Sequence, residues 1–201
     1  MAAAAVDGMD GPRRVAVWSG LASSAVGFGA TLLAVAISPT FAWPTNALSD
    51  LGAAGEPTAW LFNGGLVVAG LAGLPFGWVL LSAARGTLER AGGALFAGSV
   101  AALALVGAFP IGTDPHLPVA VAYFLLFTLA MGAHGAGAAL AGDRRRGLAS
   151  VGLGVAHVLS WLAWSAAGPP GLAIPEIVGS GLLLAWVVLT TRWLRSEAGW
   201  A

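Results

Sequence analysis

Apolar residues along this chain occur in long continuous runs and do not alternate with polar residues. Six runs are long enough for a helix that crosses a bilayer, which takes roughly 20 residues at 1.5 Å per residue. They cover residues 15–37, 59–84, 91–109, 117–141, 147–167 and 172–191. None contains an arginine, and Glu176, predicted as a helix starter after Pro175, is their only acid. The pattern predicts an all-α fold: a polytopic integral membrane protein with a six-helix transmembrane bundle, forming one membrane domain over residues 1–201.

Basic residues predict the orientation of this bundle. All nine bases are arginines, and six spans would place every one of them on the same side of the membrane. They are Arg13, Arg14, Arg85, Arg90, Arg144, Arg145, Arg146, Arg192 and Arg195. Loops rich in arginine stay in the cytoplasm. We therefore expect both termini to be cytoplasmic (N-in/C-in) and the protein to lie in the cell (cytoplasmic) membrane.

Composition agrees with a lipid-embedded surface. Hydrophobic residues make up 58% of the chain and charged residues only 9%, against roughly 25% charged residues in a soluble domain. The formal net charge is zero and no basic patch is present, so nucleic acid is not a predicted partner. The predicted partners are membrane lipids. The absence of cysteine excludes disulfides, thiolate metal sites and cysteine nucleophiles. The pattern leaves the oligomeric state open.

Small residues recur four positions apart within three of the runs. The sets are Ser19, Ser23 and Gly27; Ala69, Gly73 and Gly77; and Ala133, Gly137 and Ala141. Small side chains at this spacing let two helix backbones approach closely. The spacing therefore favours a compact bundle.

The longest loop, residues 38–58, carries the first candidate site. On a short helix after Pro44, residues Asn46, Ser49 and Asp50 fall at i, i+3 and i+4 and share one face. Leu48 and Leu51 fall on the opposite side and are expected to dip into the membrane interface. One interpretation is a capped, solvated turn at the membrane surface, and the other is a polar site.

A second polar group precedes the fourth run. Asp114 followed by Pro115 is typical of a helix start, with the aspartate as N-cap. His116 lies in the first turn, where a cation opposes the helix dipole, so we expect a neutral ring in water. We predict that the two loops meet on the extracytoplasmic side and form one polar cluster. Its members are Asn46, Ser49, Asp50, Asp114 and His116.

Two histidines, His134 and His157, lie inside the fourth and fifth runs, at a similar expected depth in the cytoplasmic half. Ionisable groups within the membrane are costly and are candidates for function. A neutral ring hydrogen-bonded between helices and a proton relay both explain them. Two histidines without a third ligand are a weak metal signal, so no metal site and no cofactor are predicted.

No sequence motif assigns a reaction to the chain. It has no H-E-x-x-H, G-x-S-x-G or Walker motif, and no G-x-G-x-x-G after a strand. The favoured hypothesis is a multi-pass membrane protein, non-enzymatic or associated with lipids, that uses the extracytoplasmic polar cluster. One alternative is an intramembrane hydrolase or lipid-modifying enzyme that uses Asp50, Asp114 and His116, around a divalent metal. Another is a small proton-coupled transporter that uses His134 and His157.

The segment Asn46-Ala47-Leu48-Ser49-Asp50-Leu51-Gly52 carries a family resemblance. Together with Ser38-Pro39, Phe109-Pro110 and His116, it resembles the archaeal and bacterial membrane proteins catalogued as domain of unknown function 998. That resemblance implies a six-helix protein of unassigned activity.

A more distant resemblance rests on four positions. The stretch Ser49-Asp50-x-Gly52 is similar to the Ser-Asp-Thr-Gly signature of a eukaryotic six-span group, although Leu51 stands in place of the threonine. This group contains damage-regulated autophagy modulators and factors that remodel GPI-anchor lipids. The similarity implies a role with lipids.

Overall fold

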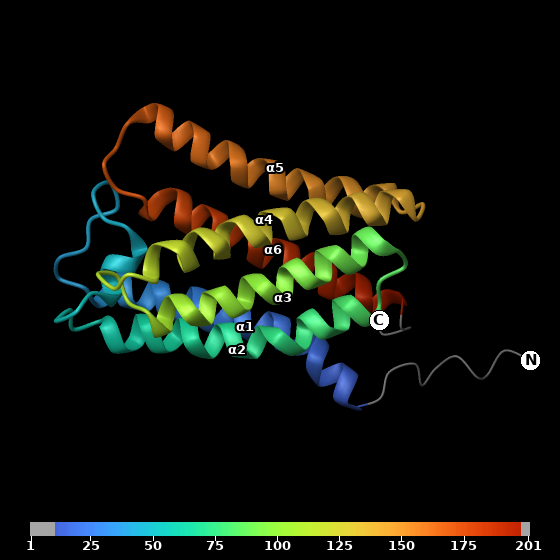
Figure 1. The fold of residues 1–201 in the computed structure, drawn as a ribbon, viewed down its shortest axis with the longest axis horizontal. Coiled ribbons are helices and arrows are strands. Elements are labelled where there is room, and N and C mark those ends of the chain that lie inside the picture. Colours follow the sequence, from blue (N-terminus) through green and yellow to red (C-terminus); the bar gives the residue numbers. More distant parts are fainter. Residues whose placement is uncertain (1–10, 198–201) are drawn as a thin grey trace, which may run out of the picture.

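The computed structural model describes residues 11–197, which form six α-helices and one short 3-10 helix (Figure 1). The elements are α1 (Gly11–Ile37), η1 (Leu48–Gly52), α2 (Ala59–Ser82), α3 (Thr87–Ala108), α4 (His116–Leu140), α5 (Arg144–Ala167) and α6 (Ala173–Glu197). No strand occurs in this part of the chain. Each α-helix corresponds to one predicted span, and all six are long and apolar enough to cross a membrane.

Helices that follow one another in the chain pack side by side, from α1 to α5, and α6 closes the bundle against α1 and α5. Only residues 83–86 separate α2 from α3, and only residues 141–143 separate α4 from α5. Such short connections require antiparallel neighbours. Figure 1 shows that α1 begins and α6 ends at the same end of the bundle. The chain termini themselves, predicted to be cytoplasmic, lie outside the described residues.

Small residues bring the first three helices into close contact, which agrees with the compact bundle that the spacing of small residues favoured. The Ser23 hydroxyl on α1 donates a 2.7 Å hydrogen bond to the Ala69 carbonyl on α2. On the other side of α2, a Cβ added at Gly70 would lie 2.5 Å from the Val100 oxygen and the Ala104 nitrogen of α3. Backbone therefore meets backbone at Gly70, and no larger residue fits there.

The loop between α1 and α2 folds over the end of the bundle. Leu48 and Leu51 in η1 are 7% and 1% exposed and pack with Phe62 of α2 and Val106 of α3. The expectation that these leucines enter the membrane interface is therefore wrong. They complete the hydrophobic core, because η1 lies across the helix ends and the core accepts both side chains.

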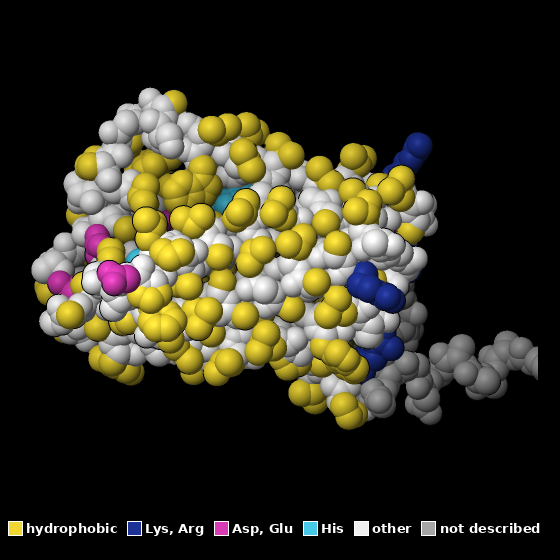
Figure 2. Space-filling model, in the orientation of Figure 1, with side chains coloured by type: hydrophobic (Ala, Val, Ile, Leu, Met, Phe, Trp, Pro, Cys, Tyr) yellow, Lys and Arg dark blue, Asp and Glu magenta, His cyan; other side chains and the backbone are white. Residues whose placement is uncertain are grey.

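Basic and acidic side chains gather at opposite ends of the molecule in the face shown in Figure 2. One end, which we name the arginine end, holds the start of α1, the α2–α3 and α4–α5 turns and the end of α6. The opposite end, the loop end, holds residues 38–58, 109–115 and 168–172 and no basic residue. Between the two ends, large apolar side chains such as Leu71 and Leu125 are more than half exposed. This apolar belt is the surface that lipid would cover.

Candidate functional site

The loop at residues 38–58 is shaped by Asn46 and Asp50. The Asn46 side chain accepts a 2.9 Å hydrogen bond from the Ala42 amide and donates one of 2.8 Å to the Asp50 carboxylate. That carboxylate also accepts a 3.0 Å hydrogen bond from the Ala47 amide at the start of η1. Both polar side chains are therefore engaged within their own loop, and they set its conformation.

The same loop is bound to the start of α6. The Asn46 carbonyl accepts hydrogen bonds from the amides of Leu172 and Ala173, at 3.0 and 2.9 Å. Next to them, Gly171 packs so closely that an added Cβ would lie 2.6 Å from the Asn46 oxygen. The Glu176 carboxylate, one turn into α6, accepts a 2.6 Å hydrogen bond from the Leu48 amide. The loop and the start of α6 thus form one unit.

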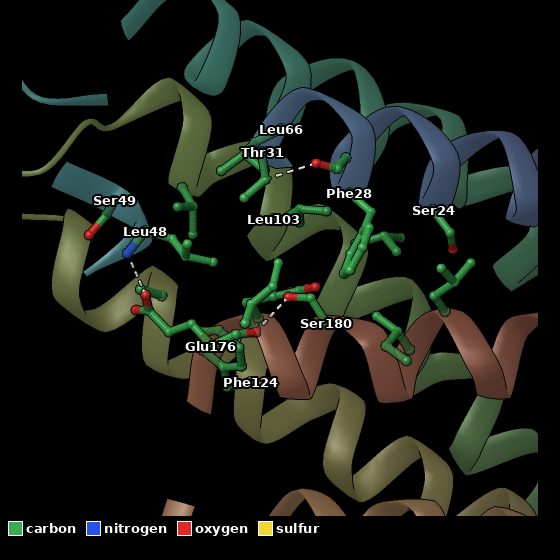
Figure 3. Close-up of a pocket in the computed structure, with 18 of the residues that line it drawn as sticks. Ser24, Phe28, Thr31, Leu48, Ser49, Leu66, Leu103, Phe124, Glu176 and Ser180 are labelled. Carbon is green, nitrogen blue, oxygen red and sulfur yellow. Dashed lines mark hydrogen bonds between the residues drawn. The ribbon is translucent and has the colours of Figure 1, made fainter. Parts of the chain in front are cut away.

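Beneath this unit lies a cavity of about 90 Å³ between α1, α2, α3, α4 and α6 (Figure 3). Its loop end is lined by three polar side chains that come from three elements: Ser49 of η1, His116 of α4 and Glu176 of α6. Its walls are mainly apolar and include Phe28, Leu66, Leu103, Leu183 and Leu184. The hydroxyls of Ser24, Thr31 and Ser180 also line it. A charged and polar end on a mainly apolar cavity matches the division of an amphiphilic molecule.

His116 is buried in this cavity wall, at 8% exposure, and is not in water as predicted. Its Nδ1 lies 2.8 Å from the carbonyl oxygen of Phe109. A carbonyl only accepts, so Nδ1 carries the proton of this bond. The fold thus fixes the ring, and Nε2 is the nitrogen that can serve a ligand.

Asp114 stands apart from the cavity. Its side chain is exposed, and α4 begins at His116 without a side-chain cap, so the predicted N-cap at Asp114 is wrong. The turn before α4 is closed instead by Thr113, whose amide and hydroxyl both bond to the Pro110 carbonyl. These local bonds leave the aspartate pointing outward.

The five residues of the predicted polar cluster therefore lie in three places. Ser49 and His116 share the cavity, Asn46 and Asp50 shape the loop, and Asp114 is outside. Glu176, predicted only as a helix starter, does lie in the first turn of α6 and also completes the polar end of the cavity. Its one sequence signal was that it is the only acid within a predicted span.

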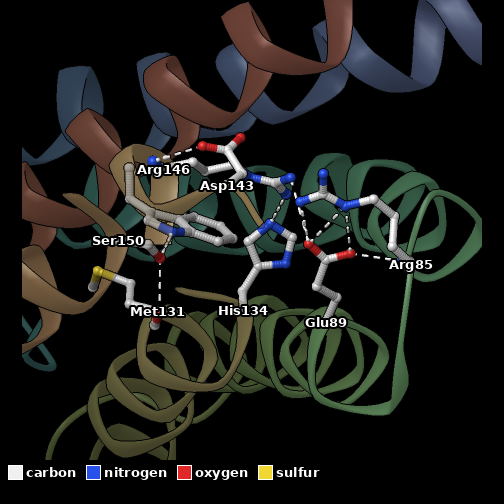
Figure 4. Close-up of polar contacts among 8 residues, drawn as sticks. Arg85, Glu89, Met131, His134, Asp143, Arg146 and Ser150 are labelled. Atoms are coloured by element: carbon white, nitrogen blue, oxygen red, sulfur yellow. Dashed lines mark hydrogen bonds and ion pairs between the residues drawn. The ribbon is translucent and has the colours of Figure 1, made fainter. Parts of the chain in front are cut away.

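A second polar cluster lies at the arginine end (Figure 4). Glu89 is only 1% exposed and accepts hydrogen bonds from the Arg85 amide at 2.6 Å and the Arg85 guanidinium at 2.8 Å. Arg146 of α5 lies 3.5 Å from the same carboxylate and donates to Nε2 of His134. The cluster joins α3, α4 and α5 and was missed, because Glu89 fell in a predicted loop. The Arg85–Glu89 spacing of four was its available signal.

His157 is held in a chain of hydrogen bonds between α4 and α5. The Trp161 indole donates to Nε2 at 2.8 Å, and Nδ1 lies 2.7 Å from the Thr128 hydroxyl, which in turn donates to the Phe124 carbonyl. An indole N–H is only a donor, so Nε2 holds a lone pair and Nδ1 donates to Thr128. The contact with Thr128 joins α4 to α5, which is the arrangement of the first of the two interpretations of His157.

The sequence suggested that the two histidines lie at a similar depth, and this prediction is wrong. His157 contacts Thr128, which lies six positions before His134 on α4, or about 9 Å along a helix. His134 instead contacts Arg146 at the arginine end. Each histidine ring accepts a hydrogen bond from a group that can only donate.

Among the described residues no group of three or more His, Cys, Asp or Glu could hold a metal ion.

Fold and surface together define the class: this is a multi-pass membrane protein with six apolar helices. A family model described as "Protein of unknown function (DUF998)" matches residues 21–193, and the chain belongs to this family. The resemblance predicted from the sequence is thereby confirmed. No curated protein and no solved structure matches the chain.

Proposed function

We propose that this protein binds one amphiphilic membrane lipid, with the polar group of the lipid in the cavity at the loop end. The observation that carries the proposal is the convergence of Ser49, His116 and Glu176 on one end of a cavity whose walls are mainly apolar. These side chains come from three elements of the fold. Buried polar groups are costly unless they bond to something, and a lipid headgroup supplies such partners.

Charge restricts the chemistry of this headgroup. All nine bases of the chain lie outside the loop end, so no arginine is available there for a phosphate. The cavity instead presents the Glu176 carboxylate, with a hydroxyl and an imidazole beside it. A carboxylate repels anions and binds amines and hydroxyls through charge-assisted hydrogen bonds. The ligand class is therefore a lipid with a free amine or hydroxyl group.

The distribution of arginines supports an orientation for this site. With the arginine end in the cytoplasm, the loop end faces the extracytoplasmic side of the cell membrane. A lipid of the outer leaflet would then have its polar group level with the cavity. The protein would act on lipids of that leaflet by holding them, without a chemical step.

Thermal unfolding of the purified protein in detergent tests the proposal with three probes that share one chain: dodecylamine, dodecanol and dodecanoate. A ligand that binds only the folded state stabilises it, by about 2.7 kcal/mol at a hundred times its Kd. We expect stabilisation by the amine and the alcohol and none by the carboxylate. Glu176→Gln should abolish the advantage of the amine over the alcohol, because it removes the charge and keeps an oxygen for the Leu48 amide.

Asp114→Asn is the matched control, since it removes an acid at the same end that does not line the cavity. It should leave the selectivity unchanged. Equal stabilisation by all three probes, or an unaltered amine preference in Glu176→Gln, would contradict the proposal.

The two alternative functions receive less support. For a hydrolase built on Asp50, Asp114 and His116, the first residue is engaged in its own loop and the second is exposed. For a proton-coupled transporter, His134 and His157 each accept a hydrogen bond from an obligate donor. A ring with that nitrogen occupied is poorly placed to pass protons along a relay.

A further inference from the structure

A groove of about 430 Å³ opens between α4, α5 and the start of α6. Its rim consists of Leu117, Val121 and Leu125 of α4 and Val158 and Leu162 of α5, all between 46% and 70% exposed. All five lie within helices long and apolar enough to cross a membrane. The groove therefore faces the hydrocarbon of the bilayer.

The floor of this groove contains polar side chains that are already satisfied. Thr128, His157 and Trp161 line it and bond to one another and to the Phe124 carbonyl. A floor whose polar groups are paired among themselves offers little to a polar ligand and accepts an apolar one. Hydrocarbon is thus the chemistry that fits the groove.

The groove and the interior cavity have one wall in common. Ala120, Phe124 and Glu176 line both of them. The Phe124 ring lies against the His157 ring on the groove side, with centroids 5.9 Å apart, and against Tyr123, a cavity residue, at 4.9 Å. Within residues 11–197, Glu176 is the one carboxylate that lines both spaces.

The groove and the cavity differ in size. Ligand pockets measure roughly 300–1,000 Å³. The groove, at about 430 Å³, is within this range, whereas the cavity, at about 90 Å³, is below it. The cavity has room for a small polar group and the groove has room for a chain.

We infer that the α4–α5 groove binds one acyl chain of the lipid whose polar group lies at Glu176, and that Phe124 marks the passage between the two. This inference rests on the proposed function and adds the location of the chain and the side from which the lipid enters. The acyl chain of the lipid runs from Glu176 along α4 and α5 toward Thr128, and its outer side stays in contact with the bilayer. The lipid can therefore enter sideways from the membrane.

Photocrosslinking tests this location with a dodecylamine that carries a diazirine halfway along its chain. In the purified protein, we expect crosslinks on peptides containing Val121, Leu125 and Val158, and we expect excess dodecylamine to remove them. Leu125→Trp, which fills the groove from its rim, should abolish the competed crosslinks. Leu71→Trp is the control, since Leu71 is 57% exposed on α2 and lines neither space.

Each outcome separates this inference from the proposed function. Competed crosslinks on the cavity residues Phe28, Leu103 or Leu184 would overturn the inference and leave the proposed function in place. Crosslinks that are spread over all apolar surfaces and are not removed by excess dodecylamine would also overturn the inference. The proposed function would then be tested by the stabilisation that dodecylamine gives in thermal unfolding. If no crosslink at the groove is competed and Leu125→Trp changes the oligomeric state, a second copy of the protein occupies the groove and the inference is wrong.

Discussion

The carboxylate of Glu176 accepts a 2.6 Å hydrogen bond from the backbone amide of Leu48, a residue 128 positions earlier in the chain. This bond joins the loop over the cavity to the helix that supplies the cavity's carboxylate. One side chain therefore has two tasks, to hold the loop in place and to line the site. Its two tasks can be separated by substitution.

Replacing Glu176 with alanine should loosen the loop. A hydrogen bond to a charged group contributes about 1.5–3 kcal/mol, and Glu176→Ala should lower the free energy of unfolding by this amount. Glu176→Gln should cost less, because its amide oxygen can still accept from Leu48. Chymotrypsin cleavage at Phe41 should quicken in the alanine variant alone. Glu56→Ala, whose carboxylate makes only a 3.4 Å contact with Thr40, is the control and should behave as wild type.

The cluster at the arginine end should contribute more to stability than any contact at the loop end. Glu89→Leu removes the buried carboxylate that Arg85 and Arg146 both contact. Breaking a buried ion pair in this way costs about 3–5 kcal/mol. We expect a large fall in the unfolding temperature in detergent, and little change for Arg90→Gln at the next, exposed position. A stable Glu89→Leu variant would show that the cluster is not a structural lock.

Two glycines of α2 should respond in opposite directions to alanine. Gly64 has open space where a Cβ would be added, and there Gly64→Ala should stabilise the helix by up to about 1 kcal/mol. At Gly70 the added Cβ would meet the backbone of α3 at 2.5 Å, so Gly70→Ala should destabilise by about 1–3 kcal/mol. Thermal unfolding of the two variants side by side measures the difference. A neutral Gly70→Ala would mean that α2 and α3 can separate without cost.

The hydrogen bonds of His157 should contribute modestly and not independently. Interhelical hydrogen bonds in membranes average about 0.6 kcal/mol, so His157→Gln and Trp161→Phe should each lower stability by about this amount. Their double variant should lose less than the sum, because both changes break the same bond. Trp60→Phe, at a tryptophan that is 75% exposed, serves as the control for removal of an indole. Strict additivity would contradict the hydrogen-bonded pair.

The orientation can be measured with single cysteines, because the natural chain has none. Ala54→Cys and Thr113→Cys at the loop end should react with an impermeant maleimide applied to intact cells. Ala141→Cys at the arginine end should react only after the membrane is opened. All three positions are exposed, so accessibility within the protein does not confuse the result. Labelling of position 141 in sealed cells would reverse the proposed orientation.

Sequence reasoning located the spans well because their signal is local. The free energy of transferring an apolar run into lipid depends on the residues of that run and not on the rest of the chain. α1 and α3 begin at Gly11 and Thr87, earlier than their predicted starts at residues 15 and 91, because charged residues near the membrane surface continue a helix that hydropathy alone would end. The spacing of small residues such as Ser23, Gly27 and Ala69 likewise predicted a compact bundle.

The site was predicted only in part, because its members meet through packing. Ser49 and His116 were selected as polar residues in loops, and the fold places both at one cavity. Glu176 was predicted only as a helix starter, and Glu89 fell between two predicted spans. Their sequence signals, a lone acid within a span and an arginine four residues away, do not reveal which helices bury them.

The sequence by itself thus determined that this protein has six apolar helices, which of their ends carry the arginines, and which small residues let the first helices approach. Those properties depend on neighbours within a few turns. Only the tertiary structure decided that Glu176 holds Leu48, that Glu89 lies between two arginines, and that Phe124 lines both a cavity and a groove. Each of these depends on which helices pack together, because a buried polar group takes its partner from whatever surface the fold brings against it.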